Sequence, residues 1–311
     1  MEAKEYCERA YAKSSNKDYA GAIEDYNKAI ELDNEYEQAY FDRAFCKSEL
    51  EDYKGAIEDY NFLAQRNDFE DLPDVYYFRG CCYSSLENHT QALNDLNKAI
   101  ELNPECAVYH FLLASLYQSK EEFDKALVHY ERANELDSSY KDESKKDICY
   151  CAFHIGDKLL HEKQYTKALE YFNRVLELDN NHERAYVQRA YCRGILEDYN
   201  GAIEDYKVAL TLNTDDSMTY YNFGYVTYKQ DHTKGAKYFT TFIDKASQQK
   251  EHSEEVANAY YLRGLTYMNN KAYTNAIEDF TRAIEAGFKG KEISKKIEAC
   301  NDKIMETSVT Q

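Results

Sequence analysis

Small and apolar residues recur along this chain with the period of an α-helix, in seven separate segments. Each segment has an alanine, an aromatic residue or leucine four positions later, and a small or apolar residue three positions after that. This spacing places three side chains on one helix face, where small residues let a neighbouring helix approach closely. The trios are Ala22, Tyr26, Ala29; Ala56, Tyr60, Leu63; Ala92, Leu96, Ala99; Ala126, Tyr130, Ala133; Ala168, Phe172, Val175; Ala202, Tyr206, Ala209; and Ala276, Phe280, Ala283.

Another helical segment precedes each of these, and an eighth lies between the sixth and the seventh trio. Each has a residue that is usually bulky, followed four positions later by alanine or glycine. The pairs are Tyr6 and Ala10, Tyr40 and Ala44, Tyr76 and Gly80, His110 and Ala114, Ala152 and Gly156, Tyr186 and Ala190, Tyr220 and Gly224, and Tyr260 and Gly264. The string Asp-Tyr-x-Gly-Ala-Ile-Glu-Asp-Tyr occurs at 18–26, 52–60 and 198–206, and its first two copies lie 34 residues apart. The pattern therefore predicts repeated pairs of helices with a period of 34 residues.

These residues and this period resemble the tetratricopeptide repeat (TPR) family. In the numbering used below, the trio occupies positions 20, 24 and 27 of each repeat, and the first-helix pair occupies positions 4 and 8. Tyrosine stands where the family most often has tryptophan, and only the third repeat has the family's proline at position 32, Pro104. The resemblance implies an all-α, right-handed superhelical solenoid of about eight helix-turn-helix units and a C-terminal capping helix. The expected repeats 1 to 8 are 3–36, 37–70, 73–106, 107–140, 149–182, 183–216, 217–249 and 257–290, and the capping helix is 291–306.

Three places depart from the regular repeat. The segments 141–148 and 250–256 are charged and contain no glycine or proline, so we expect them to lengthen the first helices of repeats 5 and 8. Repeat 7 is degenerate: it is one residue short between its helices and has Gly235 or Ala236 at the packing position. The capping helix is expected to cover an otherwise exposed apolar face.

Five repeats carry arginine at position 7, and the same five carry aspartate at position 23. Repeats 4 and 5 have neither residue. Repeat 4 has Leu113 and His129 at these positions, and repeat 5 has Ile155 and Tyr171. We predict an ion pair between the two helices of a repeat, bidentate where the geometry permits. The alternative is that arginine and aspartate are merely frequent surface residues. The pairs are Arg9 and Asp25, Arg43 and Asp59, Arg79 and Asp95, Arg189 and Asp205, and Arg263 and Asp279.

The resemblance implies a concave binding face lined by first-helix positions 2, 5, 6, 9 and 12. In this chain those positions are rich in aromatic residues with acidic residues among them, which favours a groove for an extended segment or a helix. The alternative is that each ring packs partly against the neighbouring helix. The predicted groove residues are Tyr11, Phe41, Asp42, Phe45, Asp74, Tyr77, Phe78, Phe111, Phe153, Tyr191, Tyr221, Tyr225 and Tyr261.

One known activity of the family is disfavoured. Co-chaperones that hold the acidic C-terminus of Hsp70 or Hsp90 use lysine, arginine and asparagine at positions 2, 5, 6 and 9 of three successive repeats. The matching positions here are Cys7, Tyr11, Asp42, Asp74 and Phe78. Two carboxylates in place of cations would repel a carboxylate ligand, which argues against a carboxylate clamp.

The net charge of −19 disfavours nucleic acid and anionic membranes as partners and favours a basic or neutral one. The first residues, 1–13, are polar, with no apolar stretch suited to a signal peptide or a membrane span. Together with nine cysteines, which we expect to be reduced thiols, this predicts a cytoplasmic location.

Catalytic and metal-binding motifs find little support. Cys151 and His154 share a helix face near Cys149, but a zinc site needs about four ligands and no second cluster is evident. The chain contains no glycine-rich phosphate loop, no Gly-x-Ser-x-Gly and no histidine pair at metal spacing. We therefore expect no enzyme activity, no cofactor and no metal.

The sequence thus predicts a non-enzymatic protein-protein interaction scaffold or adaptor whose partner is a protein or peptide with basic and apolar anchors. One alternative is a conformational sensor whose superhelix changes pitch on binding a short peptide or small molecule. Another is a self-associating structural subunit. The identity of the partner and the oligomeric state stay open.

Overall fold

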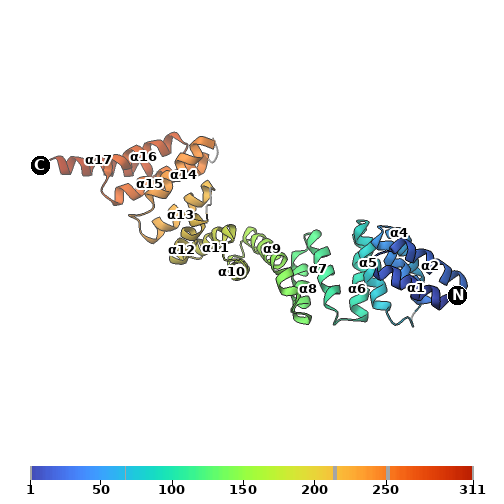
Figure 1. The fold of residues 1–311 in the computed structure, drawn as a ribbon. Coiled ribbons are helices and arrows are strands. Elements are labelled where there is room, and N and C mark those ends of the chain that lie inside the picture. Colours follow the sequence, from blue (N-terminus) through green and yellow to red (C-terminus); the bar gives the residue numbers. More distant parts are fainter. Residues whose placement is uncertain (1, 67, 213–215, 250–252, 310–311) are drawn as a thin grey trace. The chain divides into compact units, whose positions relative to one another are not determined.

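The computed structural model describes residues 2–66, 68–212, 216–249 and 253–309, and these residues form seventeen helices and no strand (Figure 1). The helices are α1 (Ala3–Ser15), α2 (Tyr19–Leu32), α3 (Glu37–Glu49), α4 (Tyr53–Leu63), α5 (Leu72–Ser85), α6 (His89–Leu102), α7 (Ala107–Ser119), α8 (Phe123–Leu136), α9 (Tyr140–His161), α10 (Tyr165–Leu178), α11 (Glu183–Ile195), α12 (Tyr199–Thr211), α13 (Ser217–Gln230), α14 (Ala236–Gln249), α15 (Ser253–Asn269), α16 (Tyr273–Glu285) and α17 (Ile293–Val309).

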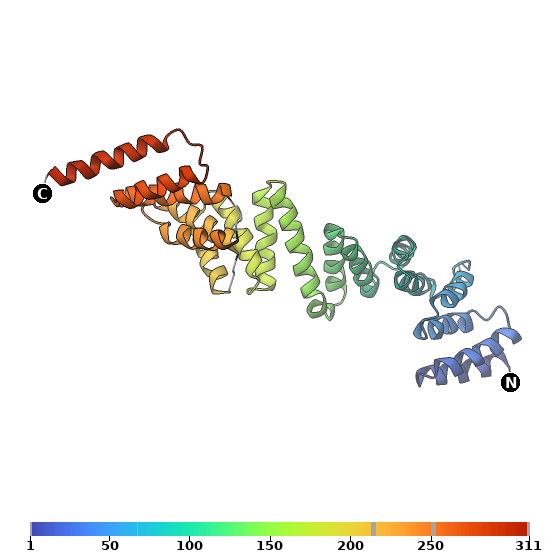
Figure 2. The same ribbon diagram turned by 90° about the horizontal axis from the view of Figure 1, so that it is seen from above.

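The chain forms two compact bodies, and the boundary between them falls between Cys151 and Ala152, within α9. Inside each body the helices pack in chain order: the two helices of a repeat contact each other, and the second helix then contacts the first helix of the next repeat (Figure 2). An array of this kind has no single centre, and its core is a series of contacts between neighbouring helices. The N-terminal body ends with residue 151 and the C-terminal body begins with residue 152.

The core lies where the sequence pattern predicts it. Every member of the seven trios at positions 20, 24 and 27 is fully buried, including Tyr26, Tyr60, Tyr130 and Tyr206. Tyrosine at position 24 thus serves chiefly as a large apolar side chain. It fills the space between two helices, and the small residues beside it allow these helices to approach each other.

The repeated Asp-Tyr-x-Gly string forms the start of a second helix. Asp18 Oδ1 accepts a hydrogen bond from the backbone N–H of Gly21 at 3.0 Å and so caps α2. A Cβ atom at Gly21 would lie 2.3 Å from Asp18 Oδ2, so glycine leaves room for the capping carboxylate. The same cap joins Gly55 to Asp52 and Gly201 to Asp198.

Repeat 7 makes its internal turn differently. In the seven other repeats, position 15 is a lysine or glutamate in the left-handed conformation. In repeat 7, α13 ends at Gln230 and the chain reaches α14 through Gly235, whose φ is 106°. Gly235 stands four residues before Phe239 and seven before Phe242, both fully buried, so Gly235 and not Ala236 takes the packing position. Glycine is needed there because a Cβ would lie 2.8 Å from the carbonyl oxygen of Gly224.

The segment 141–148 lies inside α9, a single helix of 22 residues. Residues 250–252, part of the second expected extension, lie outside the described residues, and α15 begins at Ser253. The last helix, α17, begins at Ile293 and not at residue 291 as expected. Gly287, with a φ of 94°, and Gly290 precede it, and glycine favours such a turn over a helix. Ile293 and Cys300 are buried against α16.

Glycine at position 8 marks the closest approach within a repeat. A Cβ at Gly264 would lie 2.8 Å from Phe280 Cε1, and one at Gly80 would lie 3.2 Å from Leu96 Cγ. A rigid, fully buried ring cannot move aside without disturbing its neighbours, whereas a leucine side chain can adjust by a few tenths of an ångström.

We therefore expect Gly264→Ala to be more destabilising than Gly80→Ala. The first substitution should lower the free energy of unfolding by about 1–3 kcal/mol, the usual cost of overpacking. The second should be near neutral, because the better helix propensity of alanine offsets the small clash. Urea unfolding followed by circular dichroism tests the order, and a larger loss for Gly80→Ala would contradict the packing argument.

Candidate functional site

The structure brings each position-7 arginine to the position-23 aspartate of its own repeat. Arg43 Nε donates to Asp59 Oδ2 at 2.9 Å and Arg43 Nη2 donates to Asp59 Oδ1 at 2.6 Å. Its third nitrogen, Nη1, donates to Asn27 Oδ1 on the preceding second helix at 2.7 Å. The same two-bond geometry joins Arg9 to Asp25, Arg79 to Asp95, Arg189 to Asp205 and Arg263 to Asp279. In repeats 3, 6 and 8 the arginine Nη1 also donates to a side chain of the preceding second helix, which is Asn61, Asn173 and Thr240 respectively. One arginine therefore links three helices.

A second cation reaches the same carboxylate in three repeats. Lys47 Nζ lies 2.9 Å from Asp59 Oδ2 and also donates to the carbonyl oxygen of Gly55. Lys13 and Arg193 stand at the same position, 11, and make the matching bonds in repeats 1 and 6. The hydrogen bond from Arg9, joined by Lys13, lowers the pKa of Asp25 to about 2. These position-11 residues and the position-25 asparagines escaped the sequence analysis, although reading those two positions down the repeats would have shown them.

Repeat 4 has two histidines in place of this network. His129, at the aspartate position, lies with its Nδ1 3.0 Å from Nδ1 of His110, whose Nε2 is 3.1 Å from the carbonyl oxygen of Pro104. The two imidazoles are stacked, and Tyr117 stacks on His129. Burial, with the nearby His110, lowers the pKa of His129 to about 4, and burial also lowers the pKa of His110. The pair is therefore neutral near pH 7, and one ring donates to the other.

The predicted groove residues of the N-terminal body pack partly against one another. Phe78 lies edge-on to Phe41 and Phe45 at centroid distances of 5.8 and 6.0 Å, and Tyr77 is tilted against Tyr109 at 5.2 Å. The predicted groove residues Phe41, Phe45, Tyr77, Phe78 and Phe111 are half-buried, so each contributes both to packing and to the surface. Tyr11 is 64% exposed and is the most open of the predicted groove residues.

The two predicted acidic groove residues are already hydrogen-bonded within the chain. Asp42 Oδ1 accepts from Gln38 at 3.0 Å, and burial raises the pKa of Asp42 above its ordinary value. Asp74 Oδ1 accepts a short hydrogen bond from the hydroxyl of the buried Tyr109. Both carboxylates are half-buried and remain acceptors at the surface of the first helices.

In the C-terminal body, Tyr191, Tyr221 and Tyr225 meet around a cavity of about 230 Å³. They come from position 9 of α11 and positions 5 and 9 of α13, so the cavity lies between the first helices of repeats 6 and 7. Burial raises the pKa of Tyr221 to about 12 and also raises the pKa of Tyr206 well above its ordinary value, so these phenols stay neutral. The remaining lining residues are Gly194, Ile195, Tyr206, Asn222 and Val226.

Phe153 does not offer the binding surface that was expected of it. It is 4% exposed, since it packs against Phe172 and His182 of the C-terminal body. Tyr261 is half-buried, and Phe288 from the segment after α16 stacks on it at a centroid distance of 4.3 Å. Phe288 stands at position 32 of repeat 8, after the second helix, so the pattern of first-helix aromatic residues does not include this contact.

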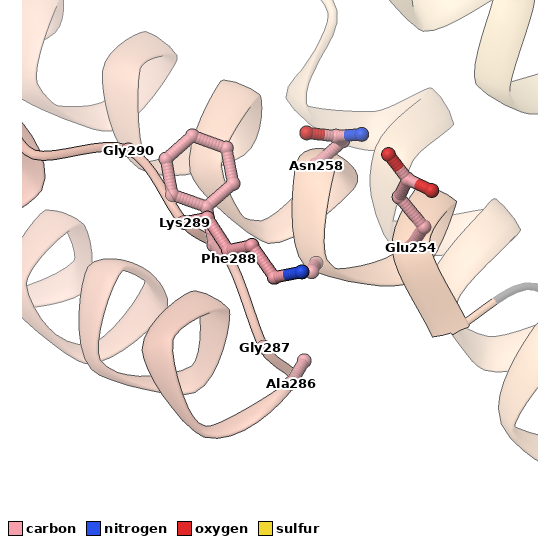
Figure 3. A pocket seen from close by; sticks show the side chains of 8 residues that line it. Glu254, Asn258, Ala286, Gly287, Phe288, Lys289 and Gly290 are labelled. Carbon is pink, nitrogen blue, oxygen red and sulfur yellow. The ribbon is translucent and has the colours of Figure 1, made fainter.

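Two larger cavities lie elsewhere in the C-terminal body. One, of about 400 Å³, lies between α15 and the segment after α16; Figure 3 shows Phe288 and Lys289 on that segment, near Glu254 and Asn258 of α15. It offers charges of both signs. The other, of about 440 Å³, lies beside the irregular turn of repeat 7, between Ile203, Phe223 and Tyr238. Neither joins the first-helix aromatic residues of two repeats.

The described residues contain no group of three or more His, Cys, Asp or Glu side chains arranged to hold a metal ion. Of the helices in the described ranges, none combines the length and the apolar character that a membrane span requires.

Comparison with known proteins accounts for the repeated helix pairs. Three family models, each described as a tetratricopeptide repeat, match residues 3–36 and 183–216, residues 73–106 and 257–286, and residues 104–181, which together make up more than half of the chain. The chain belongs to the tetratricopeptide repeat family. A TPR repeat-containing protein of Methanocaldococcus jannaschii is 29% identical over 127 residues, which are 40% of this chain but only 22% of that protein.

Solved TPR structures are similar in fold. YrrB, described as a TPR protein with an unusual peptide-binding site, is 22% identical with a TM-score of 0.47, over 64% of this chain and 96% of its own. The C-terminal part of a TPR protein from Cytophaga hutchinsonii is 16% identical with a TM-score of 0.47, over 83% and 99%. The TPR2AB domain of yeast Sti1, solved with pHSP90, is 17% identical with a TM-score of 0.47, over 85% and 97%. At these levels the likeness concerns the fold alone.

The ion pair of this TPR chain occurs with one cation on the aspartate, as in repeat 3, and with two, as in repeat 2. Removing the arginine from each form gives a matched pair of substitutions. Arg79→Met leaves the buried Asp95 without its cation, because Tyr83 stands at position 11 of repeat 3, whereas Arg43→Met leaves Asp59 paired with Lys47. We expect Arg79→Met to lower the free energy of unfolding by about 3–5 kcal/mol and Arg43→Met to lower it by less. Urea unfolding measures both, and an equal or larger loss for Arg43→Met would refute the role of the second cation.

The histidine pair predicts a loss of stability in acid. Its folded-state pKa values lie below the ordinary 6.5, so the unfolded chain takes up protons that the folded chain does not. Stability from this pair is complete above pH 6.5 and is lost as the pH falls toward 4. The unfolding free energy of His129→Gln should therefore depend less on pH than that of the native chain in this window. Parallel curves for the two proteins would exclude the pair as the cause.

Proposed function

We propose that this TPR chain is a non-enzymatic interaction module that binds a peptide segment or helix on the first-helix face, meaning positions 2, 5, 6, 9 and 12 of its repeats. The observation that carries the proposal is the cavity between α11 and α13, where Tyr191, Tyr221 and Tyr225 from two successive repeats line one opening. Ligand sites are typically concave and mostly apolar, with a few polar groups that orient the ligand.

The chemistry of this cavity supports binding more than catalysis. Its wall consists of tyrosines, aliphatic side chains, a glycine and Asn222. The raised pKa values of Tyr206 and Tyr221 keep their hydroxyls protonated at neutral pH. General acid-base catalysis needs a group that gains or loses a proton near the working pH, and the wall supplies none. Rings with a polar end suit a partner that presents apolar side chains and hydrogen-bonding groups together.

The charge of the chain favours a partner with basic residues. The net charge is −19, and Asp42 and Asp74 place carboxylates beside the half-buried rings of the N-terminal body. Electrostatic complementarity of this kind raises the rate of encounter more than the final affinity. An acidic chain terminus, the ligand of a carboxylate clamp, would be repelled by the same two residues. The partner we propose therefore carries basic and apolar anchors.

In the N-terminal body, Tyr11 is an exposed aromatic residue on the first-helix face. Phe41 and Phe78 have a mixed role, since they pack against each other as well as reaching the surface. A charge introduced at Phe41 would therefore damage packing along with binding. The tyrosines at the cavity of the C-terminal body are the better residues for a functional test.

The test is a peptide selection with matched variants. A random peptide library is panned on the immobilised native chain, and fluorescence anisotropy then measures the selected peptides on Tyr191→Ser/Tyr225→Ser and on Ile284→Ser. The control removes an exposed apolar side chain from α16, a second helix of the same body.

We expect the double variant to weaken binding at least about 10-fold, since each large apolar side chain contributes roughly 1.5–3 kcal/mol when buried. The control should bind like the native chain, and circular dichroism checks that both remain helical. A library that yields no binder, or binders that the double variant retains, would reject the first-helix face as the site.

A further inference from the structure

Repeat 7 lacks the ion pair that joins the two helices in five other repeats. Phe223 stands at position 7 in place of arginine, and Tyr238 stands at position 23 in place of aspartate. The two rings stack at a centroid distance of 3.8 Å, and Phe223 is buried. Stacking of two aromatic rings therefore replaces the contact between arginine and aspartate in this repeat.

The link to the preceding second helix is lost as well. In repeats 2, 3, 6 and 8 the arginine Nη1 donates to a side chain at position 25 of that helix, as Arg189 does to Asn173 at 2.8 Å. Phenylalanine has no donor, and the position-25 residue that precedes repeat 7 is Lys207. A cation thus stands where those repeats have a neutral acceptor.

A cavity of about 440 Å³ lies at this junction, between α12, α13 and the start of α14. Its wall includes Phe223 and Tyr238 together with three lysines, Lys207, Lys234 and Lys237. No aspartate or glutamate of the described residues lines it. The chain has 57 acidic and 38 basic residues, so a wall with cations alone is opposite in sign to the molecule as a whole.

Two of the three lysines have no carboxylate that balances them. Lys234 Nζ lies 3.1 Å from a carboxylate oxygen of Asp231. Within the described ranges, no acidic side chain forms an ion pair with Lys207 or Lys237. Lys237 Nζ instead lies 4.6 Å from the centre of the Tyr238 ring, which places its charge at the cavity wall. Lys207 and Lys237 therefore leave two positive charges unbalanced.

The start of α14 adds a weaker attraction of the same sign. Asp198 caps α12 with its carboxylate, whereas Gly235, the residue before α14, has no side chain that could do so. Gly235 and Ala236 both line the cavity. The first turn of a helix favours a negative group, and here no carboxylate of the cavity wall supplies one.

We propose that this cavity binds the phosphate group of a phosphate monoester. Such a group carries a charge of about −1.5 to −2 near pH 7, which matches two unbalanced lysines. Its organic part lies against the half-buried Tyr238 and Ala236. A phosphorylated side chain of a protein and a small phosphate ester share this chemistry.

This site is distinct from the proposed peptide site. The first-helix residues in its wall are Phe223, Thr227 and Gln230, which stand at positions 7, 11 and 14. The first-helix face consists of positions 2, 5, 6, 9 and 12. Each site can therefore be tested without the other.

Other ligands fit the wall less well. A carboxylate carries a single charge and would balance only one of the two lysines. An uncharged apolar ligand would cover lysine side chains without meeting their charge. A nucleic acid would bring a long row of phosphates to a chain whose net charge is −19, and repulsion would oppose its approach.

Isothermal titration calorimetry with phenyl phosphate tests the site on the native chain and on three double variants. Lys207→Gln/Lys237→Gln removes the two unbalanced charges, and Lys207→Arg/Lys237→Arg keeps them. Lys158→Gln/Lys167→Gln is the control, because it removes two charges from exposed residues of the same body that lie outside the cavity wall. The control separates a local contact from the attraction of the whole molecule.

We expect phenyl phosphate to bind the native chain with a Kd of about 1 mM or lower, and benzoate, a monoanion with the same ring, to bind more weakly. Lys207→Gln/Lys237→Gln should weaken phenyl phosphate binding about 3- to 10-fold, the effect of losing two partly exposed charge contacts. The control and the arginine variant should stay within about 2-fold of the native chain. Circular dichroism checks that all variants remain helical.

Three results would overturn the site: no binding of phenyl phosphate to the native chain, an equal loss in the two glutamine variants, or equal affinity for benzoate. None of them bears on the peptide site, which the Tyr191 and Tyr225 substitutions test. A phosphotyrosine peptide flanked by glycines separates the two sources. Tighter binding of this peptide than of phenyl phosphate supports a phosphorylated side chain, and the reverse supports a small ester.

Discussion

The contact between the position-24 side chain and the small residue at position 8 sets the spacing of the two helices in each repeat. Two solutions occur in this chain. Where position 8 is alanine, position 24 is tyrosine, as in repeats 1, 2, 4 and 6; where it is glycine, position 24 is phenylalanine or leucine, as in repeats 3, 5, 7 and 8. In the second group the missing Cβ lets the first helix lie directly against the ring or the leucine. With the spacing fixed, position 7 faces position 23, and the arginine can meet its aspartate in a single geometry.

The choice of tyrosine introduces a polar atom into the core, and the first helix then determines its surroundings. The Tyr130 hydroxyl bonds to Gln118 and Ser115, whereas repeat 6 has Tyr191 and Gly194 at the same positions, and the Tyr206 hydroxyl has no partner among the described residues. The positions that can satisfy the hydroxyl, 9 and 12, are also positions of the first-helix face. The packing of a repeat and the chemistry of its surface therefore share these two positions.

Much of the fold follows from the sequence because each contact recurs at one spacing. The buried trios, the helix pairs and the meeting of Arg43 with Asp59 need only the helical period and a fixed repeat length. The cavity could not be predicted in this way, because its wall combines predicted aromatic residues with Gly194, Ile195, Asn222 and Val226, which a list of aromatic positions does not include. The prediction for Phe153 was wrong for a related reason: its repeat position suggests exposure, but its ring packs against Phe172 and against His182, the last residue of the same repeat. Phe288 stands at position 32 of repeat 8, in the segment after the second helix, so the helical periodicity could not place it.

Repeats 4 and 6 depart from the common pattern in physically different ways. Repeat 4 lost both members of the ion pair, and the structure compensates fully: Leu113 is buried as an apolar residue, and His129 bonds to His110. Loss of one member alone would have left a charge buried and unpaired, so the two changes depend on each other. Repeat 6 kept its ion pair, but no group in the described part of the chain bonds to the Tyr206 hydroxyl. A departure that the protein satisfies by itself carries no cost in unpaired polar atoms, whereas the unpartnered Tyr206 hydroxyl is a cost that the packing of its buried ring must offset.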